Sequence, residues 1–333
     1  MKINRKDLLN ALQMVESGIS RTDTILQSSC VVMRRGWFYT LSREIACAMS
    51  SGLPIEIDAA IKADKLIDVL RKIKDEEVFV TGSIESLSIK GSGRSKLTLE
   101  ADVTLPVDMV ERPAKTAWQK LAPDFAEAVD LAVQCTRRKD DRWIKTCVHI
   151  TSDWIEASDD NKMIRYPIKT FVTDPILVRG TSIKTIIDLG MTVGAETEYW
   201  LHFRNPLGLR VSVQKFPEES YPDLSLFAAI RGRRIVFPKT LSSSAEIAEV
   251  FTDEEKGIKI SLAKRSLVVY SRNSDGEYEE AMDIEYEGDS FNFQIPPKLI
   301  AELVSKFTEC EITESTIRVD GKKFVYVAAL GVE

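Results

Sequence analysis

The feature that most constrains the fold of this chain is a repeated order of helix-like and strand-like segments. Six short segments carry apolar residues three or four positions apart, the spacing that places them on one face of a helix. They contain, in order, Leu8, Leu66, Phe125, Ile183, Leu241 and Leu299. Strand-like runs lie between them, so the order helix, strands, helix, strands occurs three times. This repetition predicts three similar units rather than one large core.

Several of the strand-like runs alternate apolar and polar residues, which is typical of antiparallel sheets with one solvated face. Residues 209–213 and 258–262 alternate in this way, and residues 37–41 form a further strand-like run rich in aromatic residues. Turn-forming pairs such as Asp320-Gly321 separate these runs. The glycine-rich residues 91–93 lie between two strand patterns and not at the start of a helix. They therefore predict a hairpin turn and not a phosphate-binding loop.

Two polar stretches, residues 111–114 and 231–234, divide the three copies. They give domains of 1–112, 113–230 and 231–333, each of a usual domain size. We therefore predict an α+β fold of three similar domains, each with two helices and antiparallel sheets. Three unrelated α+β domains are the alternative.

The composition bounds the function. A formal net charge of −6 argues against a protein that coats nucleic acid by its overall charge, but it allows basic groups confined to one surface. The five cysteines are far apart and odd in number, which argues against a disulfide framework or a zinc site and suits a reducing cytoplasm. No run approaches the ~18 consecutive apolar residues of a membrane helix, and no signal peptide is visible.

The inventory of reactive residues does not indicate an enzyme. Both histidines, His149 and His202, lie in strand patterns, where a packed or surface role is the common one. The sequence has no His-x-x-x-His or Cys-x-x-Cys pair for a metal. Residues 242–244 are serines on a helix without a candidate base, and residues 159–161 are typical of a hairpin turn. We expect no catalytic residue, no metal and no cofactor.

Four stretches, spread in order over the whole chain, share their pattern and spacing with one known family. They are residues 66–71 with 91–99, residues 216–224, residues 250–260 and residues 326–333. Together they resemble the bacterial DNA polymerase III beta subunit, the DNA sliding clamp. The resemblance implies a head-to-tail homodimer that closes a ring of six similar domains, with strands outside and twelve helices around the hole.

The resemblance also implies the function. The ring would encircle double-stranded DNA without sequence preference and tether a replicative DNA polymerase, with a clamp loader as a further partner. Loose phosphate contacts, which weaken with salt, are enough for a ring linked to DNA by topology. Arg21 matches an arginine that approaches DNA in the family. The other candidates are cations on or beside the predicted helices: Lys65, Arg71, Lys72, Lys74, Arg137, Arg138, Lys139 and Lys184. For any one of them, a solvated helix face is the alternative.

In the family, partner proteins insert a short apolar peptide into a pocket between the second and third domains. By similarity that pocket involves Ser158, Asp160, Asn161, Lys162, Met163, Arg179, Ile183, Val327, Ala329 and Leu330. Residues 158–163 replace the family's Thr-Asp-Gly-His-Arg-Leu, and residues 329–332 replace its Met-Pro-Met-Arg. The small Ala329 predicts a wider or shallower cleft, and Lys162 cannot reproduce the planar fork of arginine. For Val327 and Leu330, ordinary strand packing is the alternative.

These departures raise the hypothesis of a divergent clamp carried by a phage or another mobile element. The seam of the ring would join the first domain of one protomer to the third domain of its partner. Leu97 and Leu99 match the family's interface strand, and Val250 with Phe251 match the opposing helix end. Packing of the two leucines in their own core is the alternative. A non-ring, three-domain scaffold that binds peptides but not DNA is the other function that fits, and an enzyme with an unfamiliar site is a more remote one.

Overall fold

The computed structural model describes residues 2–22, 25–52, 58–83, 85–100, 102–218, 221–253, 257–307 and 309–331. Residues 219–220, 254–256 and 332–333, which belong to the stretches that resemble the clamp family, lie outside the described residues. The chain forms two compact units, Met1–Ile155 with Ile168–Glu219 and Glu156–Pro167 with Ser220–Glu333. No helix in the described ranges has the length and apolar character needed to cross a membrane.

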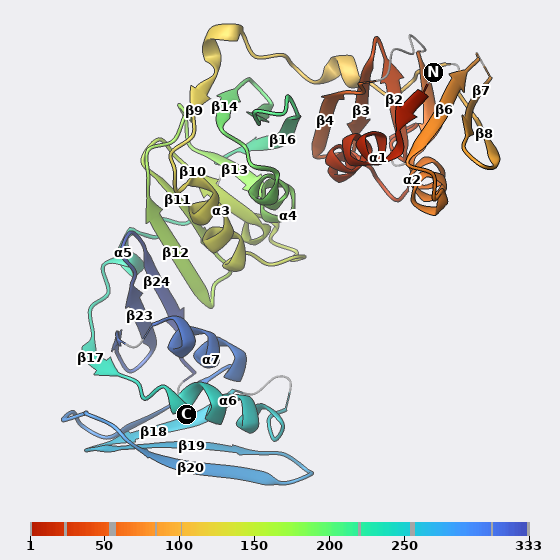
Figure 1. The fold of residues 1–333 in the computed structure, drawn as a ribbon. Helices are drawn as coiled ribbons and strands as arrows, with labels where there is room; N and C mark the ends of the chain where they lie inside the picture. Colours follow the sequence, from red (N-terminus) through yellow and green to blue (C-terminus); the bar gives the residue numbers. More distant parts are fainter. Residues whose placement is uncertain are drawn as a thin grey trace. The chain divides into compact units, whose positions relative to one another are not determined.

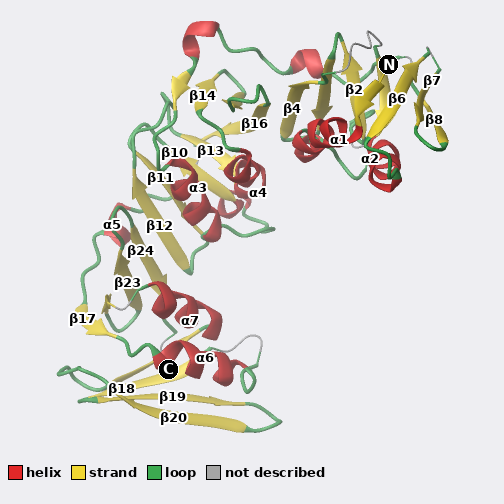
Figure 2. Ribbon diagram, viewed as in Figure 1, coloured by secondary structure: helices red, strands yellow, loops and turns green. Residues whose placement is uncertain are grey.

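The first repeat, Lys2–Thr98, contains two helices packed on each other and two antiparallel sheets of four strands (Figures 1 and 2). The strand orders are β1-β6-β7-β8 and β5-β2-β3-β4. The elements are β1 Lys2–Asn4, α1 Arg5–Met14, β2 Cys30–Arg34, β3 Trp37–Leu41, β4 Ile45–Ser50, β5 Ala59–Lys62, α2 Ala63–Lys72, β6 Glu77–Gly82, β7 Ser86–Lys90 and β8 Arg94–Thr98. As expected, Gly91-Ser92-Gly93 form the hairpin turn between β7 and β8.

The second repeat, Gln119–Pro217, has the same order of elements. Its second helix begins as an α-helix and continues as a 3-10 helix, η5, which is followed by Gly190 with a left-handed φ of 62°. The elements are β9 Gln119–Lys120, α3 Phe125–Gln134, β10 Cys147–Ile150, β11 Trp154–Ser158, β12 Lys162–Pro167, β13 Ile176–Arg179, α4 Gly180–Ile183, η5 Lys184–Leu189, β14 Val193–Glu196, β15 Trp200–Arg204 and β16 Arg210–Pro217.

The third repeat, Arg233–Ala329, again pairs two helices and two antiparallel sheets, β17-β22-β23-β24 and β20-β19-β18-β21. The elements are β17 Arg233–Val236, α6 Thr240–Glu249, β18 Ile258–Ala263, β19 Ser266–Arg272, β20 Glu277–Asp283, β21 Phe291–Ile295, α7 Pro297–Lys306, β22 Glu309–Ile312, β23 Thr316–Asp320 and β24 Val325–Ala329. A short helix, α5 Ser225–Ala228, precedes this repeat. The predicted fold class of three similar α+β units is confirmed.

Half of the polar stretch 231–234, which begins the predicted third domain, belongs to a strand. Arg233–Val236 form β17, which pairs with β22. Ile235 points into the core with 1% of its surface exposed, between exposed neighbours. Arg233 and Arg234 are both exposed, so the composition of this strand resembles that of a linker.

Burial explains why the helices form where they do. In α2, Leu66, Ile67 and Leu70 lie on one face and are buried, while the charged residues of the helix face water. Helix α7 starts at Pro297, where a missing backbone N–H costs nothing. The five cysteines are all buried thiols that form no disulfide. Burial raises the pKa of the Cys47 and Cys147 thiols to about 11, so these two stay protonated and unreactive.

The repeats are joined by strand pairing in a constant way. The last strand of a later repeat pairs with the fourth strand of the earlier one: β16 pairs with β4, and β24 pairs with β12. We call these pairs the first joint and the second joint. The first joint brings Ser212 opposite Ala46, and the second brings Val327 opposite Met163.

The two joints have the same register. The turn before β4 closes with a hydrogen bond from the Ser42 N–H to the Ile45 carbonyl, and the turn before β12 closes from Asp159 to Lys162. Ala46 is the residue after Ile45, and Met163 is the residue after Lys162, so the two hold equivalent positions behind their turns. Ala46 pairs with Ser212, the third residue of β16, and Met163 pairs with Val327, the third residue of β24. Each repeat therefore meets its neighbour through equivalent residues.

Candidate peptide site and cationic surfaces

An apolar cluster lies on one face of the second joint. Met163 and Val327 face each other across β12 and β24, with 3% and 4% of their surfaces exposed, and Leu224 packs against them with 2% exposed. Three partly buried side chains complete this cluster: Tyr221, Ala228 and Val325. We call these six residues the second-joint cluster.

The segment over this cluster presents apolar side chains to solvent. Helix α5 follows Leu224, and the carboxylate of Asp223 accepts the Ser225 N–H at 2.8 Å at the start of the helix. On α5, Leu226 is 77% exposed and Phe227 is 51% exposed. Exposed large apolar groups beside a buried apolar cluster are typical of a surface on which a partner packs.

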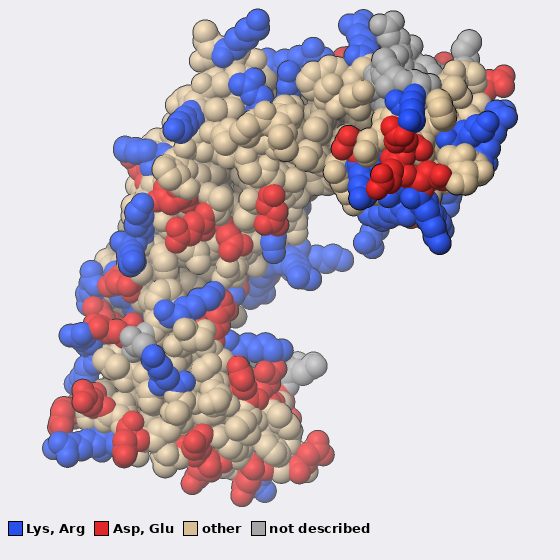
Figure 3. Space-filling view, in the orientation of Figure 1, with Lys and Arg blue, Asp and Glu red and all other residues tan. Residues whose placement is uncertain are grey.

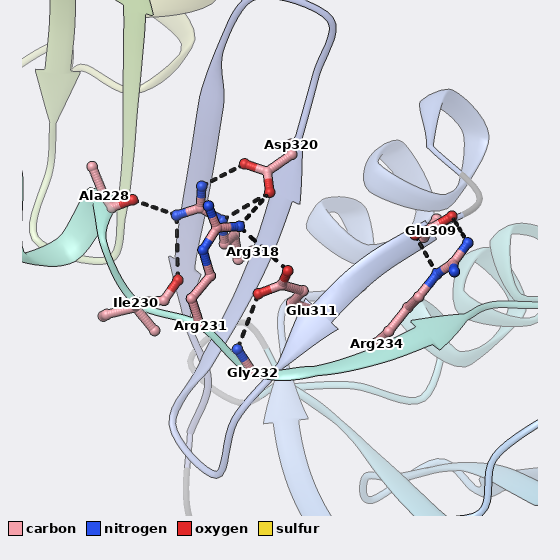
Figure 4. A network of polar contacts seen from close by, with 9 residues as sticks. All are labelled: Ala228, Ile230, Arg231, Gly232, Arg234, Glu309, Glu311, Arg318 and Asp320. Carbon is pink, nitrogen blue, oxygen red and sulfur yellow. Dashed lines mark hydrogen bonds and ion pairs between the residues drawn. The ribbon is translucent and has the colours of Figure 1, made fainter.

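A buried arginine fixes the chain that follows α5 (Figure 4). The Arg318 guanidinium donates to the backbone carbonyls of Ala228 and Ile230 and to both oxygens of Asp320, at 2.5 and 3.1 Å. Only 4% of its side chain is exposed. The Arg318 guanidinium lowers the pKa of Asp320, and Arg231, which is 2.8 Å from the same carboxylate, lowers it further. The end of α5 is therefore held by a charge that water does not reach.

The hairpin turn beside the cluster carries four of the predicted pocket residues. Asp160 and Asn161 are exposed at the turn, and Ser158 and Lys162 are half-buried at its ends. Asp160 has a φ of 77°, a left-handed conformation that aspartate tolerates better than most residues. The Asn161 carbonyl accepts the N–H of the exposed Ala329 at 2.7 Å. The turn and the end of β24 thus form one rim.

Three other predicted pocket residues lie outside the cluster. Leu330 is buried in the core of the third repeat, which agrees with ordinary packing, the alternative to a place in the pocket. Arg179 and Ile183 belong to the other compact unit. There the Arg179 Nε lies 3.2 Å from the Glu44 carboxylate, and Ile183 is fully buried.

The sequence prediction missed Tyr221, Leu224, Ala228 and Val325, which complete the cluster. Tyr221 and Leu224 lie in the stretch 216–224, so the resemblance pointed to their neighbourhood without giving them a role. The sequence offers one further sign of this cluster. Leu224 and Ala228 are four residues apart, a spacing that places both on one face of a helical turn.

The predicted DNA-facing cations of the first repeat gather on and after α2, where Figure 3 shows Lys and Arg side chains together. Lys65, Arg71 and Lys72 lie on the exposed side of the helix, and Lys74 follows it. Two of them have acidic neighbours: the Lys65 Nζ lies 3.4 Å from Asp64, and an Arg71 nitrogen lies 3.9 Å from Glu16. These pairs are solvent-exposed, so they reduce the local positive charge only moderately.

Arg21 and Arg71 line one groove with a volume of about 610 Å³. The same groove contains Glu16, Asp64 and Asp68, so its charge is mixed. A mixed groove favours loose contacts with phosphates rather than tight binding.

The predicted cations of the second repeat lie after α3 and at the start of η5. Arg138, Lys139 and Lys184 are exposed. Arg137 is 39% exposed at its side chain and binds Asp140 at 2.8 Å. The backbone N–H of Arg142 holds the pKa of Asp140 below its ordinary value, and Arg137 lowers it further, so this pair stays charged.

The predicted seam residues differ in exposure. Leu97 is half-buried on β8, and Leu99, which follows the strand, is buried with 6% of its surface exposed. The burial of Leu99 within its own repeat favours packing in its own core over a place in the seam. Val250 is 69% exposed at the end of α6, and Phe251 is half-buried.

Comparison of the sequence with protein-family models and with curated proteins finds no match. Comparison of the structure finds sliding clamps that align with the whole chain. The sliding clamp of Pseudomonas aeruginosa bound to griselimycin is 15% identical with a TM-score of 0.84, over 99% of this chain and 98% of that one. The Helicobacter pylori beta clamp bound to a DNA ligase peptide is 14% identical with a TM-score of 0.83, over 100% of both chains.

The DNA polymerase III beta chain of Streptococcus pneumoniae is 14% identical with a TM-score of 0.84, over 100% of this chain and 99% of that one. At such identities the likeness concerns the fold, and it extends over all three repeats. The chain has the fold of the DNA polymerase III beta sliding clamps.

Proposed function

We propose that this chain is a DNA sliding clamp, a ring that encircles duplex DNA, performs no catalysis and tethers a replicative polymerase through a peptide. The observation that carries the proposal is the constant way in which the repeats are joined. Within the described residues, β8 pairs only with β7 and β20 pairs only with β19. β8 is the last strand of the first repeat, and β20 is the fourth strand of the third repeat. They would be the two halves of one more joint.

Head-to-tail pairing of β8 with the β20 of a second protomer would repeat the joint and cover both edges. Such a contact joins two different surfaces, so it closes a ring when its rotation completes a circle. Exposed strand edges also promote aggregation unless they are covered. Two protomers would then place six repeats in one ring.

The register of the existing joints predicts which residues meet at this seam. In the turn before β20, the Asn273 N–H donates a hydrogen bond to the Gly276 carbonyl. The Ser42 N–H donates to the Ile45 carbonyl in the same way in the turn before β4. Transferring the pairs Ser212–Ala46 and Arg210–Ala48 of the first joint brings Lys96 opposite Glu277 and Arg94 opposite Glu279. All four are exposed, and opposite charges across a strand pair are worth about 0.2–1 kcal/mol each.

The same register supports the predicted apolar part of the seam. Leu97 is brought opposite Gly276, on the face of β8 that points to the core. A Cβ placed on Gly276 would lie 3.0 Å from Cε1 of Phe251, so Phe251 packs directly beneath this glycine. Leu97 of one protomer would therefore cover Phe251 of its partner.

The remaining parts of the proposal rest on the two surfaces described above. The exposed cations around α2, α3 and η5 would contact phosphates, and the second-joint cluster with α5 would receive the partner peptide. The acidic residues beside the α2 cations limit affinity, which suits a protein that must slide.

The experiment that tests the proposal is retention on DNA by topology. A linear duplex is fixed to a bead at one end, so that a ring can thread over the free end, and this end is then capped with a bulky protein. We expect the trapped protein to survive a high-salt wash and to leave the bead when a restriction enzyme cuts the duplex.

The matched control is the same DNA without the cap, from which a ring slides off during the wash. Protein that is lost from capped DNA as fast as from open DNA would contradict the sliding-clamp proposal. If that protein still bound peptides, the non-ring scaffold would be the better account.

A further inference from the structure

A cavity of about 300 Å³ lies at the first joint, on the sheet face that corresponds to the second-joint cluster. Its floor includes Ala46 and Ser212, which occupy the places of Met163 and Val327 in the repeat. At the second joint, the larger side chains of Met163 and Val327 are buried and fill the corresponding space. At the first joint the small side chains leave it open.

The chain between the first two repeats covers this cavity. Val107 and Val110 of that segment pack with Tyr39 and Ala46 of the sheet, as Leu224 packs over Met163 and Val327 at the second joint. Trp118 provides a further apolar wall. Both joints thus consist of a paired strand floor under a covering segment, and the first one has room for a ligand.

Four cations surround the cavity: Arg112, Lys115, Arg204 and Arg210. Within the described ranges, none of the four forms a close ion pair with a carboxylate, although Arg112 is near enough to Asp108 to lower the pKa of that carboxyl. Glu111, an acidic residue of the same lining, accepts the Tyr199 N–H at 3.3 Å and a hydrogen bond from Thr197. The cavity therefore offers a surplus of positive charge to an anionic ligand.

Aromatic rings hold two of these cations in place. The Arg204 guanidinium lies over Trp118, 4.8 Å from the ring centroid, and the Arg210 guanidinium lies over Trp37 at 4.9 Å. Stacking of this kind orients a guanidinium and leaves its N–H edge available for a carboxylate. Arginines held this way lose little freedom when they bind an acid.

Apolar side chains near the cavity are exposed to solvent. Met109, next to Val110, is 77% exposed, and Tyr199, whose N–H binds Glu111, is 55% exposed. A small molecule that fills the cavity would leave both uncovered. A peptide that continues out of the cavity would cover them, and exposed apolar groups beside a pocket indicate a protein partner.

We propose that the first-joint cavity is a second docking site, which takes a short acidic peptide of a partner protein. One apolar side chain of the peptide occupies the space above Ala46 and Ser212, and flanking Asp or Glu carboxylates bind Arg204 and Arg210. The inference rests on the proposed function, in which peptides tether partners to the ring. Each protomer then holds two partners at equivalent places of neighbouring repeats.

The test uses the full-length protein and fluorescein-labelled hexapeptides in which one Phe, Leu or Trp is flanked by Asp or Glu. Binding is measured by fluorescence anisotropy. Ala46→Leu fills the floor of the cavity, and Arg204→Gln with Arg210→Gln removes the anion contacts. We expect each change to weaken the best peptide at least about tenfold, the loss typical of a charged hydrogen bond. A second measurement, thermal unfolding, verifies that each variant is folded.

Two matched controls accompany these variants. Lys264→Gln with Arg272→Gln removes two exposed cations elsewhere in the chain, and Met163→Ala opens the second-joint cluster. We expect neither to weaken the peptide that binds the first joint. The matched peptide with Gly in place of the apolar residue is expected to bind at least about tenfold more weakly.

Three results would overturn the proposal. The first is that no peptide of the set binds more tightly than about 1 mM. The second is that Met163→Ala abolishes binding and Ala46→Leu does not, because the peptide then uses the second joint. The third is that the glycine peptide binds equally well, because charge alone then explains the attraction. Retention on capped DNA is measured without peptide, so its outcome distinguishes failure of this site from failure of the clamp proposal.

Discussion

Arg318 is a charged residue whose environment makes it structurally indispensable. Its guanidinium is nearly fully buried and donates to Asp320 and to two backbone carbonyls after α5. A buried charge is tolerated only when such partners replace water. This residue thus connects the position of α5 to β23, and through α5 it supports the apolar surface that we propose for a partner peptide.

We predict that Arg318→Met lowers the free energy of unfolding of the third repeat by about 1–3 kcal/mol, because it leaves two backbone carbonyls without their buried donor, while the half-exposed Asp320 keeps Arg231 as a partner. Urea unfolding followed by fluorescence measures the change. Arg231→Met is the control, since Arg231 binds the same carboxylate but its side chain is 63% exposed, and we expect it to cost less than about 1 kcal/mol. Equal effects of the two substitutions would contradict this role of Arg318.

His202 makes the stability of the second repeat depend on pH. Its ring nitrogens bind the hydroxyls of Ser212 and Thr197 at 2.8 and 2.9 Å. Burial lowers its pKa to about 4, although the nearby Glu111 acts in the opposite direction. Between its unfolded pKa of about 6.5 and pH 4, the unfolded chain binds a proton that the folded chain excludes. Stability from this group is therefore complete above about pH 6.5 and is lost as the pH falls toward 4.

We predict that His202→Gln removes this part of the pH dependence. Between pH 7.5 and pH 4.5, the parent protein should lose on the order of 2–3 kcal/mol more unfolding free energy than the variant. Urea unfolding at the two pH values measures it, and comparison of the two proteins cancels the carboxylates that titrate in both. The same loss in both proteins would mean that His202 is not the responsible group.

Single residues also show what the sequence could predict at this scale. Met163 and Val327 were found through the resemblance, and the structure brings them together. Leu99 could not be assigned to the core or to the seam, because alternation in a strand gives two faces without saying what covers each. Arg318 has the polar character of any solvent-facing strand residue, and only the tertiary fold reveals the carbonyls that surround it.

At the scale of elements, the edge strands β8 and β20 carry charges of opposite sign. One carries Arg94 and Lys96 and the other carries Glu277 and Glu279, all exposed. If β8 and β20 of two protomers pair in the register of the two internal joints, these charges form opposite pairs. The edges thus differ in sign, which disfavours pairing of either edge with its own copy.

We predict that Arg94→Glu with Lys96→Glu converts the dimer to monomers, because four like charges then face each other across the seam. Adding Glu277→Lys and Glu279→Lys should restore the dimer by exchanging the charges. Sedimentation velocity measures the association state. Lys72→Glu with Lys74→Glu is the control, since it reverses two charges in the same repeat away from β8. A double variant that stays dimeric, or a fourfold variant that stays monomeric, would refute this register.

Most helices and strands could be predicted from sequence, because their apolar periodicity is strong. Helices α2 and α7 match their predicted apolar faces, and β3 matches its predicted range. Strand β17 was missed, since three of its four residues are exposed or charged and its single buried residue gives no period. The 3-10 helix η5 could not be predicted either, because apolar periodicity does not distinguish a 3-10 helix from an α-helix.

At the scale of the whole molecule, the distribution of charge would decide how the proposed clamp meets DNA. The net charge is −6, yet cations gather on α2 (Figure 3). A distribution of this kind keeps DNA on one surface while the rest repels it. Repetition of the fold was predictable from sequence, but the joints were not, because they pair residues more than 150 positions apart.

We predict that Lys72→Glu with Lys74→Glu shortens the lifetime of the protein on uncapped DNA and makes it less sensitive to salt, because fewer phosphate contacts release fewer counterions. The variant should remain dimeric and should still be retained on capped DNA. Bead retention at several salt concentrations measures both effects. An unchanged lifetime and salt dependence would mean that these lysines do not face the DNA.

The central claim is that repeated joints close the chain into a ring, and the most direct measurement is electron microscopy of the purified protein with its mass determined in parallel. The account predicts a particle of twice the 37.5 kDa chain mass with a central hole bounded by six similar lobes. An open rod, or a compact particle of one chain without a hole, would contradict it.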